Sequence, residues 1–333
     1  MYQALLGWAG LLLVLGAGCQ RPTVPQRVVL YCAQDREYAE ELLADFTRQT
    51  GIAVDLRGDT EANKSVSLVA ALLREKEQPR ADVFWNNEPL GTLRLATAGV
   101  LAEYSSPAAA AFPAWTRHPT WQAFAARARV IIVHRRVPQE QRPKTLAELA
   151  EPRWQGKAAM AKPLFGTTAT HAVCLYADLG PAKARALFAR LAERLTILPG
   201  NRDVAEAVAA GRFDVGLTDT DDAVVQLRKG QPIDILYPDQ EGQGTLFLPN
   251  TLALIRGGPN PAGGKALIDF LLRPETERQL AEGPSAQLPL NPQVQARLEI
   301  PTPAQVKAWA PDFRQAAERW DEAQTLLRDL FAR

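Results

Sequence analysis

The feature that most constrains the fold is a repeated alternation of short apolar runs with amphipathic stretches. Residues 28–32 form an apolar run, residues 36–49 repeat apolar side chains at helical spacing, and a second apolar run follows at 52–56. This is the pattern of a strand, a helix and a strand, and such units build a parallel sheet covered by helices. The alternation continues through residues 66–99 and returns at 129–237. The sequence therefore predicts two α/β lobes.

Composition narrows the class of protein further. The chain has 333 residues, of which 47% are apolar and 23% charged, and this length suits about two domains. Lys and Arg total 38 against 37 for Asp and Glu, so the formal charge is only +1. Nucleic-acid-binding proteins usually carry a large basic excess. The composition thus excludes a multi-span membrane protein and argues against nucleic acid as a partner.

The N-terminus resembles an export signal. Residues 1–18 carry no charged side chain, are mostly apolar, and end in small residues directly before Cys19. The apolar run is short for a membrane-spanning helix, and small residues before a cysteine are typical of bacterial lipoprotein processing sites. We expect residues 1–18 to be a signal peptide, Cys19 to be lipidated, and residues 19–26 to be a tether. An ordinary cleaved signal with an incidental Cys19 is the alternative.

Polar residues follow the predicted strands where each strand ends. In parallel α/β sheets, ligands bind beyond the carboxyl ends of the strands. In the first lobe these positions hold Asp35, Asn87 and Glu88. We therefore expect a ligand cleft between the two lobes. In the second lobe the corresponding segments are 162–168, 199–201, 219–222 and 238–240.

Three carboxylates are clustered in one of these segments. Asp219, Asp221 and Asp222 supply hard oxygen donors, which suit a metal ion or an organic ammonium group. Asp35 and Glu88 from the opposite lobe can complete such a site when the lobes close. Helix capping is the alternative for one of the three, because Asp is favoured at the start of a helix.

A second segment favours an anion. Gly166, Thr167 and Thr168 open a predicted helix directly after a strand and a loop, so they present backbone N–H groups and two hydroxyls to the cleft. A separate anion and an acidic group of an organic ligand both satisfy these donors. Capping by the two threonines is the alternative. His171, on the same helix, is expected in the core.

Five segments together carry a family resemblance: YCAQDRE at 31–37, ADFTRQTG at 44–51, ADVFWN at 81–86, AGVL at 98–101 and LIDFL at 267–271. They resemble the extracellular solute-binding proteins of ABC importers, and in particular their ferric-iron-binding branch. The resemblance implies an α/β, two-lobed periplasmic-binding-protein fold of the type II kind, in which a cleft between lobes joined by hinge strands closes on a ligand. On this template the first lobe comprises 27–126 and 249–290, the second comprises 127–248 and 291–333, and the hinge strands are 127–133 and 245–254.

The resemblance also has a clear departure. Iron-binding members of this group usually hold Fe(III) with two adjacent tyrosines and a His or Tyr from the first loop. Asp221 and Asp222 stand where the tyrosine pair would be, and Asp35 stands where a His is often found. The resemblance therefore implies Asp221, Asp222 and Asp35 as metal ligands, without a phenolate iron site. It further implies a synergistic anion beside an arginine of the hinge, Arg127 or alternatively Arg129.

These observations lead to one functional hypothesis and its alternatives. The sequence contains none of the common catalytic motifs: a nucleophile elbow, a pair of metal-binding His residues, a phosphate-binding Gly-rich loop or a Ser–His–Asp order. We therefore expect no enzymatic activity and no catalytic cofactor. A lipoprotein that only binds other proteins is one alternative.

We expect a monomeric substrate-binding lipoprotein at the periplasmic or extracellular face of a bacterial membrane, attached only by its lipid and working with an ABC permease. Its ligand is expected to be iron(III) or another metal ion with a small anion. The alternative ligand is a small zwitterionic or cationic organic solute of the aminophosphonate, polyamine or thiamine-like kind. The expected ligand-binding residues are Asp35, Asn87, Glu88, Arg127, Gly166, Thr167, Thr168, Asp219, Asp221 and Asp222.

Overall fold

The computed structural model describes residues 26–59 and 65–332. The predicted signal peptide and Cys19 lie outside these residues, as does the tether up to residue 25. Among the helices within the described ranges, none combines the length and the apolar character that crossing a membrane requires.

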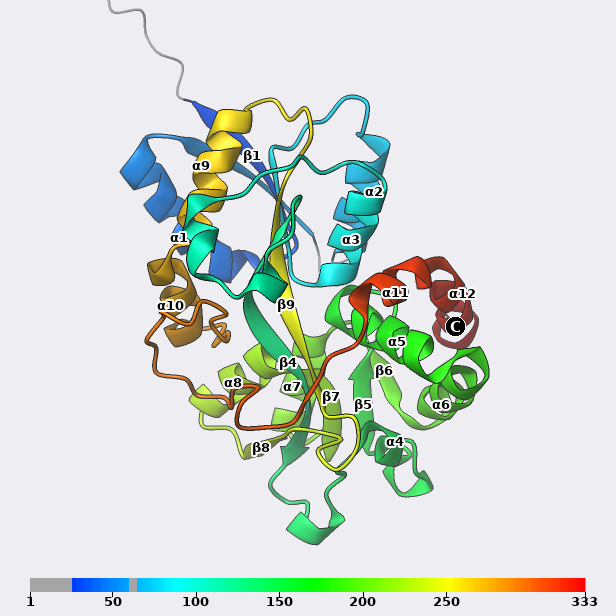
Figure 1. The fold of residues 1–333 in the computed structure, drawn as a ribbon. Helices are drawn as coiled ribbons and strands as arrows, with labels where there is room; N and C mark the ends of the chain where they lie inside the picture. The colour runs from blue at the N-terminus through cyan, green and yellow to red at the C-terminus, as the bar shows by residue number, and fades with distance from the viewer. Residues whose placement is uncertain (1–25, 60–64, 333) are drawn as a thin grey trace, which may run out of the picture.

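Two groups of strands and helices lie one above the other in Figure 1, joined by two long strands, β4 (Gln122–His134) and β9 (Thr245–Leu254). This is the predicted α/β architecture with two lobes. The first lobe contains β1 (Arg27–Cys32), α1 (Arg36–Thr50), β2 (Ala53–Gly58), α2 (Val66–Arg74), β3 (Val83–Asn86), α3 (Pro89–Thr97), α9 (Pro261–Leu271) and α10 (Pro274–Glu282). The second lobe contains α4 (Leu146–Leu149), β5 (Ala158–Ala161), α5 (Gly166–Leu179), α6 (Pro181–Arg194), β6 (Thr196–Leu198), α7 (Asn201–Ala209), β7 (Val215–Asp219), α8 (Thr220–Arg228) and β8 (Ile233–Leu236). The short strand β10 (Ala308–Trp309) and helices α11 (Phe313–Glu318) and α12 (Trp320–Phe331) end the chain.

Local sequence explains many of the element boundaries. Helix α1 ends where Gly51 adopts a φ of 72°, a left-handed conformation that glycine tolerates without a side-chain clash. Helices α3, α6, α9 and α10 each begin with proline, which suits the first turn because that position needs no N–H donor. Strand β3 is buried along its whole length, as its apolar sequence predicts.

The sheet runs in the order β2-β1-β3-β9-β4-β7-β5-β6, with β10 beside β9 and β8 beside β4. Its two ends are parallel, as expected: β1 pairs in parallel with β2 and β3, and β5 with β6 and β7. The middle of the sheet is antiparallel: β4 and β9 are antiparallel to each other, β9 is antiparallel to β3, and β4 is antiparallel to β7. Residues 122–128 of β4 pair with β9, whereas residues 129–133 pair with β7. Strand β4 therefore serves both lobes.

The C-terminal helices bridge the two lobes on one side. Helix α11 contacts α3 of the first lobe and α5 of the second, and α12 packs on α5 and α6. The exact lobe boundaries stay a prediction: 27–126 with 249–290 for the first lobe, and 127–248 with 291–333 for the second. Figure 1 shows α11 and α12 on one side of the junction and α10 on the other.

Candidate functional site

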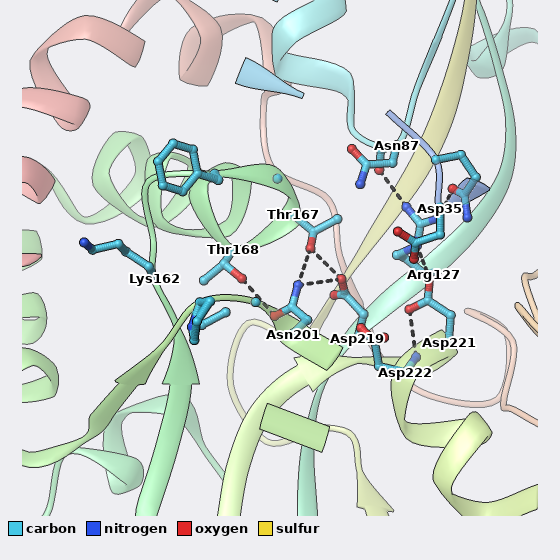
Figure 2. Close-up of a pocket in the computed structure, with 16 residues that line it drawn as sticks. Asp35, Asn87, Arg127, Lys162, Thr167, Thr168, Asn201, Asp219, Asp221 and Asp222 are labelled. Atoms are coloured by element: carbon cyan, nitrogen blue, oxygen red, sulfur yellow. Dashed lines mark hydrogen bonds and ion pairs between the residues drawn. The ribbon is translucent and has the colours of Figure 1, made fainter. Parts of the chain in front are cut away.

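A small cavity lies between the two lobes and is lined mostly by polar groups (Figure 2). Its volume is about 20 Å³, which is room for about one water-sized group. The lining residues are Gln34, Asp35 and Asn87 of the first lobe, Arg127 of β4, and Ala161, Lys162, Phe165, Gly166, Thr167, Thr168, Pro199, Gly200, Asn201, Asp219, Asp221 and Asp222 of the second lobe.

The chain brings these residues together because each group of them follows a strand. The loop from β1 to α1 carries Gln34 and Asp35, and the loop after β3 carries Asn87. In the second lobe the starts of α5, α7 and α8 meet at the same edge of the sheet. Every residue predicted to bind ligand, except Glu88, lines the cavity.

Glu88 lies outside the cavity lining because its carboxylate is used within the protein. It accepts hydrogen bonds from the backbone N–H groups of Leu90 at 2.6 Å and Gly91 at 2.9 Å, which caps helix α3. The hydroxyls of Ser65 and Thr170 also donate to it, each at 2.8 Å. A buried carboxylate with this many donors acts as a structural cap that also joins α3 to α5.

The three clustered aspartates meet as the sequence predicts. Carboxylate oxygens of Asp219, Asp221 and Asp222 lie within 4.8 Å of one another, a spacing that can hold a metal ion. Two of them are also paired with buried arginines: Asp219 lies 2.7 Å from Nη1 of Arg129, and Asp221 lies 2.9 Å from Nε of Arg127. The acidic cluster is therefore partly neutralised before any ligand arrives.

Arg127 connects both lobes through its guanidinium group. Besides Asp221, it donates to the backbone oxygen of Asn87 at 2.7 Å, to Oε1 of Gln34 at 2.7 Å and to Oδ1 of Asn250 at 3.1 Å. Burial would lower the pKa of Arg127, but the nearby aspartates outweigh burial and raise it. The side chain stays cationic, and most of its donors already have protein partners. An anion would have to replace one of those partners to bind Arg127.

A hydrogen-bonded network orders the second-lobe side of the cavity (Figure 2). Thr167 donates to Oδ2 of Asp219 at 2.5 Å, and Nδ2 of Asn201 donates to the same oxygen at 3.0 Å. Oδ1 of Asn201 accepts from Arg129 and from Thr168, each at 3.0 Å. The sequence prediction omits Asn201 from the ligand-binding set, although the segment 199–201 follows a strand. An amide at that position can both donate and accept, and this is the signal that could have identified it.

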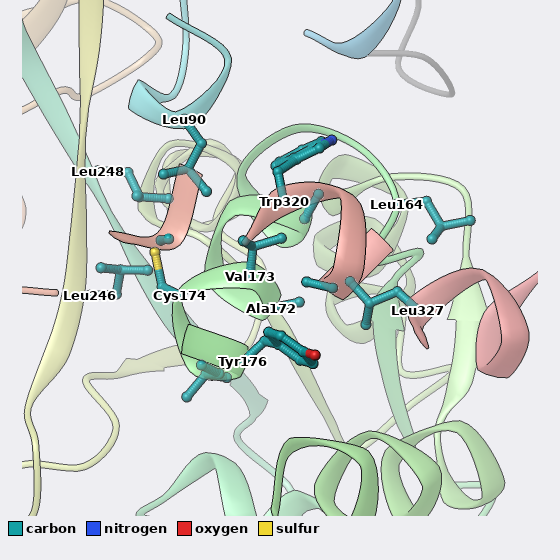
Figure 3. Close-up of a cluster of buried hydrophobic side chains, with 14 of the residues drawn as sticks. Leu90, Leu164, Ala172, Val173, Cys174, Tyr176, Leu246, Leu248, Trp320 and Leu327 are labelled. Atoms are coloured by element: carbon teal, nitrogen blue, oxygen red, sulfur yellow. The ribbon is translucent and has the colours of Figure 1, made fainter. Parts of the chain in front are cut away.

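Helix α5 is held in place by the apolar cluster behind it (Figure 3). Residues from Gly166 to Tyr176 are all buried. Val173 and Cys174 pack in a cluster that includes Leu90 from α3, and Trp320 and Leu327 from α12. Because apolar contacts surround α5, its first turn has little freedom to move. The donors at Thr167 and Thr168 are thereby positioned in advance.

Two residues near the cavity have polar atoms that lack a protein partner. Oδ1 of Asn87 is buried and accepts no hydrogen bond within the part of the chain that the structure describes. Nε and Nη2 of Arg129 are likewise buried without an acceptor among the described residues. An unsatisfied buried polar group typically costs about 1–3 kcal/mol. Since Asn87 lines the cavity, its oxygen is an acceptor that a ligand can use.

Two further titratable side chains lie close to these residues. Burial, and then the charges of Asp221 and Asp222, raise the pKa of the Tyr38 phenol, so this buried tyrosine of α1 keeps its proton at neutral pH. Tyr38 does not line the cavity. His171 is buried, as expected for a core residue, and burial followed by the charge of Arg129 lowers its pKa to about 3. Neither residue offers a charged group to a ligand at neutral pH.

Both signs of charge therefore meet in one small cavity. Asp35, Asp219, Asp221 and Asp222 supply negative charge, and Arg127 and Lys162 supply positive charge, with Arg129 directly behind. The N-termini of α5, α7 and α8 add partial positive charge. Such a site suits a cation that arrives together with an anion, or a ligand that carries both charges.

Known proteins share both the sequence pattern and the fold. A family model described as bacterial extracellular solute-binding protein matches residues 28–282. The Synechocystis protein named iron uptake protein A1 is 25% identical over 274 residues, which span 78% of this chain and 75% of that protein. Iron-bound HitA from Pseudomonas aeruginosa superposes with a TM-score of 0.83 at 23% identity, covering 92% of this chain and 99% of HitA. AfuA from Actinobacillus pleuropneumoniae, solved with exogenous fructose-6-phosphate bound, superposes with a TM-score of 0.82 at 20% identity, covering 92% and 99%.

Proposed function

Because the chain belongs to the family of bacterial extracellular solute-binding proteins, we propose that it captures iron(III) or another metal ion outside the cytoplasmic membrane and delivers it to the permease of an ABC importer. The observation that carries this proposal is the cluster of Asp219, Asp221 and Asp222 at the floor of the cleft. The similarity to iron uptake protein A1 over most of the chain supports it. The role is one of binding and release and needs no catalysis.

In this proposal the metal binds between the two lobes. Asp221 and Asp222 replace the tyrosine pair of related iron binders, and Asp35 together with Oδ1 of Asn87 completes the site from the first lobe. Carboxylate and amide oxygens are hard donors, which suit a small and highly charged ion. The size of the cavity agrees with this assignment, since about 20 Å³ accommodates a single ion in the conformation described.

A small anion completes the proposed ligand set. The N–H groups at the start of α5 and the hydroxyl of Thr168 face the cavity, and Lys162 lies at its edge (Figure 2). An anion there would balance the added positive charge of the metal. Arg127 takes part only if the anion replaces a present partner such as Gln34, because Gln34 already accepts from it.

A zwitterionic organic solute is the second candidate, and the paired charges favour it. Asp219 and Asp221 each have a buried arginine beside them, so the site presents both signs without a metal. The similar fold of AfuA holds fructose-6-phosphate. A solute of that size needs a wider cavity than the present one, so the lobes would have to close less completely around it.

Calorimetry on chelator-treated protein distinguishes the two candidates. Ferric citrate and a panel of aminophosphonates, polyamines and thiamine are titrated separately into the same preparation. The metal proposal is supported by tight ferric binding that Asp222→Asn strongly weakens. The bound iron should be nearly colourless, because none of the described residues that line the cavity is a tyrosine. Asp214→Asn is the matched control, because Asp214 pairs with Arg136 2.7 Å away and outside the cavity. Tight binding of an organic solute with no metal present would instead establish the second candidate.

Anchoring and assembly state belong to the same proposal. We propose that Cys19 carries the lipid that holds a monomeric protein at the membrane surface. Cys19→Ser should move the protein from the membrane fraction to the soluble fraction. A wild-type protein that is already soluble would contradict the anchor.

A further inference from the structure

One arginine at the edge of the cleft reaches from the second lobe to the first. Arg202 lies in the first turn of α7 and does not line the cavity. Its Nη2 is 2.8 Å from Oε1 of Glu37 and 3.5 Å from Oδ2 of Asp35. Both acids belong to the start of α1 in the first lobe. A single cation thus contacts two acidic groups across the junction.

This contact differs from the polar contacts that join the lobes around the cavity. The bonds from Arg127 to Gln34 and from Thr170 to Glu88 are buried. The side chains of Arg202 and Glu37 are 42% and 56% exposed, so their pairing lies at the solvent-facing edge. Exposed ion pairs are weakened by dissolved salt, whereas buried ones are screened much less. The edge contact is therefore one that ionic strength can control, unlike the buried contacts around the cavity.

We propose that Arg202 is an electrostatic latch: it holds the two lobes closed through Glu37 and Asp35 even when no ligand is bound. The latch is a positioning device, because Arg202 acts on the lobes and on Asp35 without lining the cavity. The inference goes beyond the proposed function, since it concerns the ligand-free protein and holds whichever ligand class is bound.

The latch has a consequence for binding. A ligand that is held by the closed form has an apparent affinity that scales with the fraction of closed molecules. An exposed ion pair contributes about 0.2–1 kcal/mol, which corresponds to about a 1.4- to fivefold change in the ratio of closed to open molecules. Loss of the latch should therefore weaken binding by at most the same factor, mainly through faster dissociation.

The test measures the distance between the lobes without ligand. Fluorophores are attached through Glu41→Cys on α1 and Lys229→Cys after α8, in full-length protein carrying Cys19→Ser. The native Cys32 and Cys174 are 1% and 0% exposed and will not react. In chelator-treated protein at low salt, Arg202→Ala should raise the ratio of open to closed molecules in the distance distribution by about 1.4- to fivefold. Raising the salt from about 0.01 M to about 1 M, which shortens the Debye length from about 30 Å to about 3 Å, should open the unsubstituted protein and should open Arg202→Ala less.

Three further variants make the result specific. Arg36→Ala removes an equal charge from the neighbourhood, but Arg36 pairs with Glu40 inside α1, so the distance should stay as in the unsubstituted protein. Arg202→Lys should restore most of the closed form. Combining Glu37→Arg with Arg202→Glu should close the lobes more than either substitution alone. The latch is overturned if Arg36→Ala opens the lobes as much as Arg202→Ala, or if ligand-free protein shows the same distance in all variants and at both salt concentrations.

Discussion

The two walls of the cleft are held in different ways. On the second-lobe wall, Thr167, Asn201 and Asp219 bond to one another and to Arg129, all within the network around the second-lobe helix starts. The first-lobe wall consists of Gln34, Asp35 and Asn87. Its contacts reach outward, since Gln34 and Asn87 accept from Arg127 and Asp35 pairs with Arg202. The second-lobe wall is thus ordered before closure, whereas the first-lobe wall is completed by closure.

The difference predicts which substitutions damage the fold and which affect only binding. Removing a member of the second-lobe wall should cost stability, because its partners are buried and remain behind without compensation. Removing a member of the first-lobe wall should cost little stability and should mainly shorten the lifetime of the bound state. Three measurements follow from this contrast.

The largest effect is expected at Asp219. Asp219→Ala leaves Arg129, which is 0% exposed, without its carboxylate partner, so the free energy of unfolding should fall by about 3–5 kcal/mol. Asp35→Ala on the first-lobe wall breaks a longer pair with the half-exposed Arg202 and should cost about 1 kcal/mol or less. Urea unfolding of both variants measures the difference. Equal losses would show that the two walls are equally pre-ordered.

Metal binding should show the next largest contrast. Asp222→Asn removes an anionic ligand of the metal. Loss of a residue that only supports a metal ligand typically weakens metal binding by about tenfold to hundredfold, so Asp222→Asn should weaken ferric binding by more than that. Asn87→Ala removes one neutral acceptor, and about fivefold is expected, mainly as faster dissociation. Stopped-flow release of ferric ion to a chelator separates the two. If Asn87→Ala slowed association instead, the first-lobe wall would already be in place before closure.

Acid should loosen the second-lobe wall through His171. The pKa of His171 in the folded protein is lowered to about 3, below its ordinary value of about 6.5. The unfolded chain therefore binds the extra proton first, and stability is lost as the pH falls from about 6.5 toward about 3, by about 1.4 kcal/mol per pH unit at most. His171→Gln should flatten this dependence in urea unfolding at several pH values. His134→Gln, at the end of β4, is the control and should leave the slope nearly unchanged.

Much of this site is predictable from the sequence because it depends on topology. Residues that follow the strands of a parallel unit gather at one edge of the sheet, so their positions along the chain are enough to predict that Asp35, Asn87 and residues 219–222 meet there. The sequence also predicts an extended strand over 245–254, and β9 has those bounds. Order along the chain suffices for these assignments.

Contacts between distant segments are not predictable in the same way. The arginine partners of Asp219 and Asp221 lie 90 and 94 residues away, so nothing near the cluster indicates its neutralisation. The first half of β4 contains several alanines, which have low strand propensity, and its pairing with β9 overrides that preference. Glu88, predicted as a ligand contact, caps helix α3 and does not line the cavity. A carboxylate after a strand can equally contact a ligand or cap the following helix, and sequence alone does not distinguish the two roles.

The central position of β9 has a consequence for how the chain folds. Residues 83–86 of β3 pair with residues 251–254 of β9, so the first lobe cannot complete its sheet until the whole second lobe has been made. The second lobe comes from one nearly continuous segment, and its more local contacts form faster. During that interval β3 presents an open strand edge, which is the kind of surface on which partly folded chains aggregate. The sheet of the first lobe, although β1, β2 and β3 are synthesised early, is therefore completed only after β9 has been made.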